Sequence, residues 1–85
     1  MKLLIARQAE TKLERMQPKV ARAILEALKT IAADPFVRHP NVKPLKGFKD
    51  AFRLRRGDWR AVYRIDRPAG LMIVEIVETR GQVYK

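Results

Sequence analysis

The chain has 85 residues, of which 19 are lysine or arginine and nine are aspartate or glutamate, so its formal net charge is +10 at pH 7. This length supports one domain with one modest core, and we treat residues 1–85 as a single domain. The lack of cysteine excludes disulfides and thiolate metal sites, and no apolar run approaches the roughly 20 residues of a membrane-spanning helix. We expect a cytoplasmic protein with no membrane association and a polyanionic partner.

The N-terminal half predicts one strand and two helices. Residues 2–6 form a short apolar segment that is typical of a strand. Apolar residues then recur at helical spacing over residues 9–16 and again over residues 18–31. The second helix should end at Asp34, because a residue that precedes a proline, here Pro35, avoids the α region. We expect the two helices to form a hairpin whose apolar stripes face a sheet.

The C-terminal half predicts three strands. Residues 51–55, 59–66 and 71–79 are rich in β-branched and aromatic residues, and glycine-containing turns separate them. Pro40 and Pro44 should hold the preceding segment extended. The last strand is almost continuously apolar, which is typical of a central strand covered on both faces. The order β-α-α-β-β-β predicts the α+β class, with two N-terminal helices packed on a small, mainly antiparallel, four-stranded sheet.

The positive charge is concentrated in one segment. Residues 43–64 contain eight basic and two acidic residues, and so carry six of the ten net charges. Arg53 and Arg55 alternate with apolar residues, so a strand would direct both guanidinium groups to one face. Four arginines are expected to converge there: Arg53, Arg55, Arg60 and Arg80. Guanidinium groups donate two parallel hydrogen bonds to phosphate, which favours a nucleic-acid backbone over a protein as partner, with a merely solvated basic face as the alternative.

Four motifs span the second half of the chain: Leu45-Lys46-Gly47, Phe52-Arg53-Leu54-Arg55, Gly57-Asp58-Trp59-Arg60-Ala61-Val62-Tyr63 and Thr79-Arg80-Gly81-Gln82-Val83-Tyr84. Taken together they resemble the RelE/ParE superfamily, the toxins of type II toxin-antitoxin systems, and the resemblance extends over essentially the whole chain. It implies a RelE-like fold and a cognate acidic antitoxin that covers the basic face.

The resemblance to RelE implies an mRNA endoribonuclease that works on the ribosome without metal or cofactor, inhibits translation and leaves a 2′,3′-cyclic phosphate. By this resemblance, Arg53 and Arg55 contact the RNA, and one of them occupies the position of the proton acceptor. Arg60 corresponds to the arginine of the transition state, Arg80 to the residue that protonates the leaving oxygen, and Tyr84 to the aromatic that orients the nucleotide. Further residues expected to bind RNA are Lys43, Lys46, Lys49, Arg56 and Arg64.

The general base is an open question, because RelE has lysines where this chain has arginines, and arginine hardly ever releases its proton. The substitutes are Lys46, Lys49, Glu78 and His39. His39 is otherwise interpreted as an exposed, solvated loop residue, and Glu75 and Glu78 as salt-bridge partners of nearby arginines. One histidine and scattered carboxylates supply no set of metal ligands.

Two other functions fit the same residues. ParE-like members of the superfamily bind DNA gyrase and inhibit it without being nucleases, and the missing base is compatible with them. A folded, inactive homologue that only binds the antitoxin is the third interpretation. For Tyr84, stacking on a base and capping of the sheet are equally compatible with the sequence.

Overall fold

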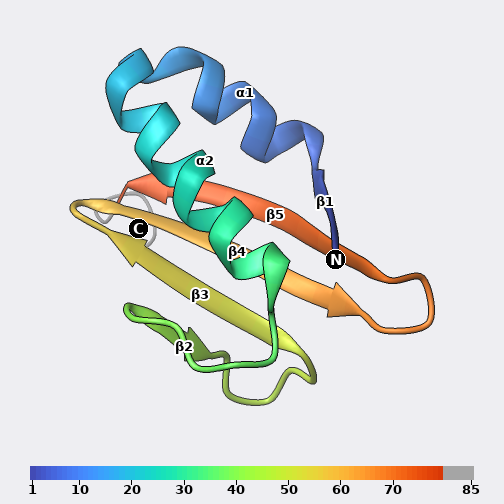
Figure 1. Cartoon of the computed structure of the whole chain (residues 1–85). Coiled ribbons are helices and arrows are strands. Elements are labelled where there is room, and N and C mark those ends of the chain that lie inside the picture. The colour runs from blue at the N-terminus through green and yellow to red at the C-terminus, as the bar shows by residue number, and fades with distance from the viewer. Residues whose placement is uncertain (80–85) are drawn as a thin grey trace.

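The computed structural model describes residues 1–79, in which two helices pack on one face of a five-stranded sheet (Figure 1). The elements in chain order are β1 (Lys2–Ile5), α1 (Arg7–Arg15), α2 (Pro18–Ala33), β2 (Val42–Pro44), β3 (Ala51–Arg56), β4 (Trp59–Asp66) and β5 (Leu71–Thr79). The predicted α+β class and the hairpin of two N-terminal helices are confirmed.

The strands lie in the order β1-β5-β4-β3-β2. β1 pairs in parallel with β5, and all other neighbours are antiparallel. The strand that the sequence analysis did not predict is β2, whose three residues include Pro44. A proline is tolerated there because an edge strand does not need every backbone N–H for pairing.

The strand β5 is internal, as predicted, but the two helices cover only one of its faces (Figure 1). On that face Met72, Val74 and Val77 are buried. On the other face Ile76 remains 42 % exposed, so the expectation of a strand covered on both faces was wrong for this part of β5.

Both helices follow from the spacing of their apolar residues. Ala9 and Leu13 of α1, and Ile24 and Leu28 of α2, lie four residues apart and are buried against the sheet. The last turn of α2 ends at Asp34, whose backbone N–H donates to the carbonyl of Ile31 at 3.0 Å. Within residues 1–79 neither helix is long and apolar enough to cross a membrane.

The strands β3 and β4 have one apolar and one basic face, as the alternation predicted. Leu54, Ala61 and Tyr63 lie in the core, and the ring of Tyr63 stacks on that of Phe52 with centroids 5.4 Å apart. Trp59 also packs against the core. Its ring is therefore on the side of the sheet opposite the arginines.

The turn between β3 and β4 begins with Gly57, which has a φ of 59°. Two-residue hairpin loops require a positive φ at their first central position, and glycine adopts it at low cost. This turn fixes the pairing of Arg56 with Trp59 and of Arg55 with Arg60.

Candidate functional site

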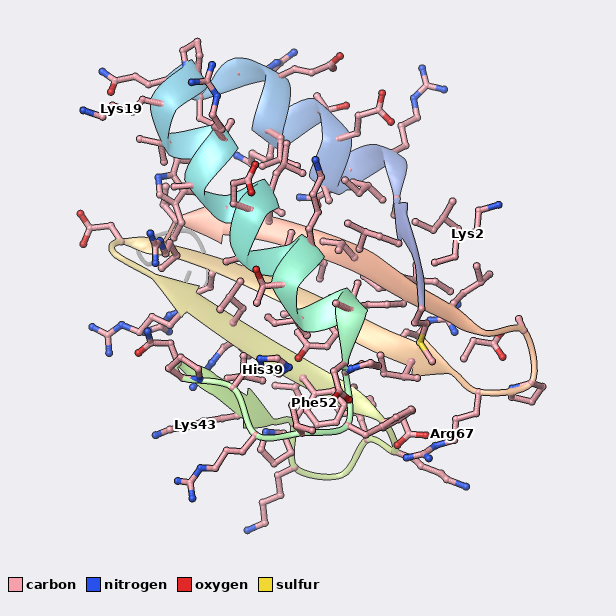
Figure 2. The ribbon with its side chains drawn as sticks, viewed as in Figure 1. Lys2, Lys19, His39, Lys43, Phe52 and Arg67 are labelled. Atoms are coloured by element: carbon pink, nitrogen blue, oxygen red, sulfur yellow. The ribbon has the colours of Figure 1, made fainter. Side chains whose placement is uncertain are left out.

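Strand register brings four basic side chains together on the face of the sheet opposite the helices. Lys43 of β2 pairs with Arg53 of β3, and Arg55 of β3 pairs with Arg60 of β4. Lys43 projects from β2 away from the helices (Figure 2). Residues 53 and 55 share this face because alternate residues of a strand point the same way.

These side chains line a pocket of about 220 Å³, which we call the basic pocket. Its lining residues are Asn41, Lys43, Arg53, Arg55 and Arg60. Like charges directly opposite one another on neighbouring strands repel, so an anion in the pocket would relieve this repulsion. The pocket therefore suits a phosphate group, which guanidinium groups bind with paired hydrogen bonds.

Arg60 is the most buried charged residue of this set, with 7 % of its surface exposed. Its neighbour on β5 is Glu78, whose carboxylate accepts a hydrogen bond of 3.2 Å from Nε2 of Gln8. The other end of the same amide, Oε1 of Gln8, accepts from the backbone N–H of Val77 at 3.4 Å. The first turn of α1 thus holds the end of β5 that lies next to Arg60.

The remaining predicted site residues are dispersed. Lys46 and Lys49 are exposed in the loop between β2 and β3 and do not line the basic pocket. Arg64 lies on the same face but forms a salt bridge with Glu75, as expected for Glu75. Arg56 lines two shallow hollows. One lies beside the basic pocket and is shared with Asn41 and Gly57, and the other lies beside α2. Arg80 and Tyr84 lie outside the described residues.

His39 differs from its predicted state. It is partly buried, and its Nε2 lies 2.7 Å from the carbonyl oxygen of Asp34, to which it donates. It therefore fixes the loop after α2 instead of being freely solvated, and it does not line the basic pocket.

Asn41 is a pocket residue that the sequence analysis missed. Its φ of 63° is a left-handed conformation, which asparagine adopts more readily than most residues. Its carbonyl accepts a hydrogen bond of 2.9 Å from the backbone N–H of Arg55, so it marks the start of the β2–β3 pairing. An asparagine directly after a proline in a presumed loop was the available signal.

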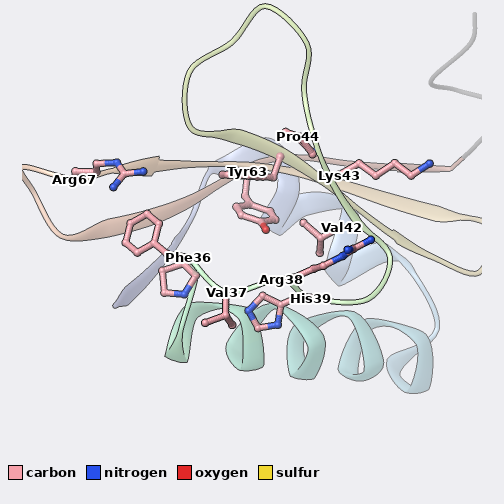
Figure 3. Close-up of a pocket in the computed structure, with 11 residues that line it drawn as sticks. Phe36, Val37, Arg38, His39, Val42, Lys43, Pro44, Tyr63 and Arg67 are labelled. Atoms are coloured by element: carbon pink, nitrogen blue, oxygen red, sulfur yellow. The ribbon is translucent and has the colours of Figure 1, made fainter.

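A second hollow, of about 640 Å³, lies between the loop after α2 and the inner face of β2, β3 and β4 (Figure 3). We call it the loop groove. At one end the guanidinium of Arg67 lies 4.3 Å from the ring centroid of Phe36 and donates two hydrogen bonds to Asp50. These bonds hold the pKa of the Asp50 carboxyl below its usual value, and burial raises the pKa of Tyr63 to about 12.

Metal binding has no support in the described part of the chain. Among residues 1–79 there is no group of three or more histidine, aspartate or glutamate side chains that could hold a metal ion.

The family described as ParE toxin of type II toxin-antitoxin system, parDE, matches residues 3–83. The chain belongs to this family. It is therefore a toxin of a type II toxin-antitoxin system, and the resemblance to the RelE/ParE superfamily is confirmed. No match is found among curated proteins.

Solved structures of RelE toxins have the same fold. A chain of the archaeal RelE–RelB complex from Pyrococcus horikoshii OT3 has 24% sequence identity and a TM-score of 0.80, with 95% of this chain and 96% of that chain covered. The isolated RelE toxin of E. coli has 20% identity and a TM-score of 0.80 over 98% of this chain and 89% of that chain. A chain of the RelBE2 complex from Mycobacterium tuberculosis has 26% identity and a TM-score of 0.73, with 93% of this chain and 96% of that chain covered.

Proposed function

We propose that this toxin cleaves mRNA on the ribosome at the basic pocket, without a metal ion, and leaves a 2′,3′-cyclic phosphate. The observation that carries the proposal is the convergence of Lys43, Arg53, Arg55 and Arg60 on one pocket in a toxin with the RelE fold. In such a reaction the ribose 2′-hydroxyl attacks the adjacent phosphorus and the 5′-oxygen leaves. Negative charge grows on the phosphoryl oxygens, and fixed cationic donors stabilise it.

Arg60 is the main stabiliser of that charge in this proposal. Its guanidinium extends from a strand whose neighbouring residues lie in the core, so little reorganisation is needed when the phosphorus becomes pentavalent. Arg53 and Arg55 bind the flanking phosphate oxygens. The roles of Arg80 as proton donor and of Tyr84 as nucleotide support follow from the resemblance alone.

Lys43 is our candidate for the general base. Among the described residues that line the basic pocket, it is the side chain that can exist in a neutral form able to accept the 2′-hydroxyl proton. Lys46, Lys49 and His39 lie elsewhere, which favours Lys43 over them. Glu78, next to Arg60 in the register, is the second candidate.

Inhibition of DNA gyrase is the second candidate function. The family to which the chain belongs carries the name ParE, and arginine is a poor proton acceptor at both positions where RelE has lysine. On this alternative the basic face binds the antitoxin or the target protein and no RNA bond is broken.

Two assays on the same purified toxin separate these functions. Primer extension on an mRNA that is being translated should give discrete stops within codons, and a supercoiling assay with DNA gyrase should show no inhibition. Inhibition of supercoiling without mRNA cleavage would replace the first function by the second. Loss of the stops when ribosomes are omitted would establish the dependence on the ribosome.

A further inference from the structure

We propose that the loop groove is a second docking site for the antitoxin, and that it holds an extended acidic segment with an apolar anchor residue. The groove lies between the loop after α2 and the helix-covered side of the sheet (Figure 3), whereas the basic pocket lies on the opposite face; Lys43 of the edge strand β2 lines both. The inference does not depend on whether the toxin cleaves RNA, because it concerns only the partner of a type II toxin.

The middle of the groove is apolar. Val42, Phe52 and Tyr63 line it on the side of the sheet, and Phe36 and Val37 line it on the side of the loop. Phe36 and Val37 remain 52% and 51% exposed, so two consecutive apolar side chains of the loop are open to solvent. An apolar side chain of a partner would remove this surface from water.

The ends of the groove are cationic. Arg38 and Lys43 extend to one end, and Arg67 lies at the other beside Phe36 (Figure 3). Arg67 is already paired with Asp50, so Arg38 and Lys43 are the side chains available to bind carboxylates. Among residues 1–79, no residue that lines the groove carries a carboxylate, and the charge of the groove is therefore complementary to an acidic partner.

The edge of the sheet beside the groove favours a peptide. The carbonyl of Asn41 accepts from the N–H of Arg55, and the N–H of Leu45 donates to the carbonyl of Ala51. Because antiparallel strands alternate the direction of their backbone groups, the N–H and C=O of Val42 and the C=O of Pro44 face away from β3. An extended segment can use such an edge for main-chain hydrogen bonds while its side chains enter the adjacent groove.

The aromatic rings argue against a nucleotide as the occupant. Phe52 stacks on Tyr63, and Phe36 is covered by the guanidinium of Arg67. Bases bind single-strand sites mainly by stacking on open aromatic faces, and here each of these rings already has a partner on one face. The apolar volume suits an aliphatic side chain better than a base.

The test is a selection of peptides on the folded toxin. Random linear peptides displayed on phage should yield sequences with aspartate or glutamate beside a large apolar residue. Val37→Glu places a carboxylate at the mouth of the groove, and Phe36→Ala removes apolar surface from it. Both should weaken binding of a selected, fluorescein-labelled peptide at least about tenfold. Both positions are exposed, and circular dichroism with thermal unfolding checks that the variants are folded.

Two control variants define the site. Phe48→Ala truncates an aromatic residue that is 69% exposed in the loop between β2 and β3, outside the groove, and should leave the affinity unchanged. Arg55→Ala, in the basic pocket, should also leave it unchanged. An affinity lost with Arg55→Ala and kept with Val37→Glu would overturn the proposal, as would a selection that enriches no such peptides.

Binding of the labelled peptide to the purified toxin–antitoxin complex tests whether the antitoxin occupies the groove. The labelled peptide should not bind the complex, because the antitoxin already fills the site. Equal binding to the free toxin and to the complex would show that the antitoxin docks elsewhere and would overturn the proposal. The affinity for a uridine oligonucleotide is measured on the same variants. If Val37→Glu lowers this affinity as strongly as it lowers the affinity for the peptide, the groove binds nucleic acid instead.

Discussion

Arg60 is the residue at which charge, burial and position coincide. It is 7% exposed, its cross-strand neighbour on β3 is a second arginine, and its neighbour on β5 is Glu78. It shares β4 with the core residues Ala61 and Tyr63, so packing against the helices already holds the strand from which its guanidinium extends. In the proposed reaction this guanidinium stabilises the charge of the phosphoryl transition state.

Replacement of Arg60 tests this role directly. Arg60→Ala should lower the rate of mRNA cleavage by about 10² to 10³, the usual loss for one donor of a preorganised site. Arg60→Lys should restore little, since a point charge does not reproduce the two-pronged contact. Arg64→Ala is the matched control, because Arg64 lies on the same strand and face but pairs with Glu75. If both Arg60 variants arrest growth as the parent does, Arg60 has no catalytic role.

A substitution of Lys43 can distinguish its positive charge from its proposed role in proton transfer. Lys43→Arg keeps the positive charge in the basic pocket but removes the side chain that can become neutral. We expect RNA binding to be retained and cleavage in single-turnover assays to fall by about 10² to 10⁴, the range for loss of a general base. Lys46→Arg, in the exposed loop, is the control and should cleave normally. Full activity of Lys43→Arg would leave Glu78 as the base to test next.

At the scale of elements, Arg67 connects three loops through its ion pair with Asp50 and its contact with the ring of Phe36. Arg67 follows β4 and donates to Asp50, which precedes β3, while its guanidinium lies over Phe36 in the loop after α2. Asp50 has a φ of 55°, and its carbonyl accepts from the N–H of Ile65 at 2.8 Å. Three separate loops are therefore fixed around one arginine.

This ion pair predicts a dependence of stability on acid. Its hydrogen bonds lower the pKa of Asp50 from the usual 3.8 in the folded state, so the pair contributes fully above that pH. As the pH falls below 3.8 towards the lower folded-state pKa, the contribution should disappear. Urea unfolding of the parent and of Asp50→Asn should therefore differ at neutral pH and converge in acid; asparagine also tolerates the positive φ. A difference that is the same at all pH values would mean that the charge of Asp50 is irrelevant.

At the scale of the whole molecule, charge and core are on opposite faces of one sheet. The helices cover the apolar face (Figure 1), and the four basic side chains of the basic pocket extend from the other face. With a net charge of +10 on 85 residues, the field of this face reaches an approaching acidic chain before contact.

Association with the antitoxin should therefore be fast and sensitive to salt. We expect the association rate constant to fall steeply between low and physiological ionic strength, because the Debye length shrinks from about 30 Å at 0.01 M to about 8 Å at 0.15 M. The double variant Arg53→Ala/Arg55→Ala should reduce this slope. The dissociation rate should respond less to salt, since exposed salt bridges contribute only about 0 to 1 kcal/mol each and we expect apolar contacts to hold the complex. An association rate indifferent to salt would show that the antitoxin does not approach over the basic face.

The sequence by itself determined those features that depend on near neighbours in the chain. The spacing of Ile24 and Leu28 indicated α2, and the alternation around Arg53 and Arg55 indicated which side chains share a face. Gly57 indicated the turn that joins β3 to β4. Each of these is fixed by backbone geometry within a few residues, and the quoted motifs were enough for the family.

Only the tertiary structure decided which charges act together. Lys43 reaches the basic pocket because β2 pairs with β3, whereas Lys46 and Lys49, a few residues later, remain in a loop. Arg64 lies on the basic face and is nevertheless paired with Glu75 from β5. The loop groove likewise arises where the segment after α2 returns over β3 and β4. These outcomes depend on strand register and on contacts between distant segments. Hydrophobic burial of the whole chain selects that register and those contacts, and no local sequence pattern encodes them.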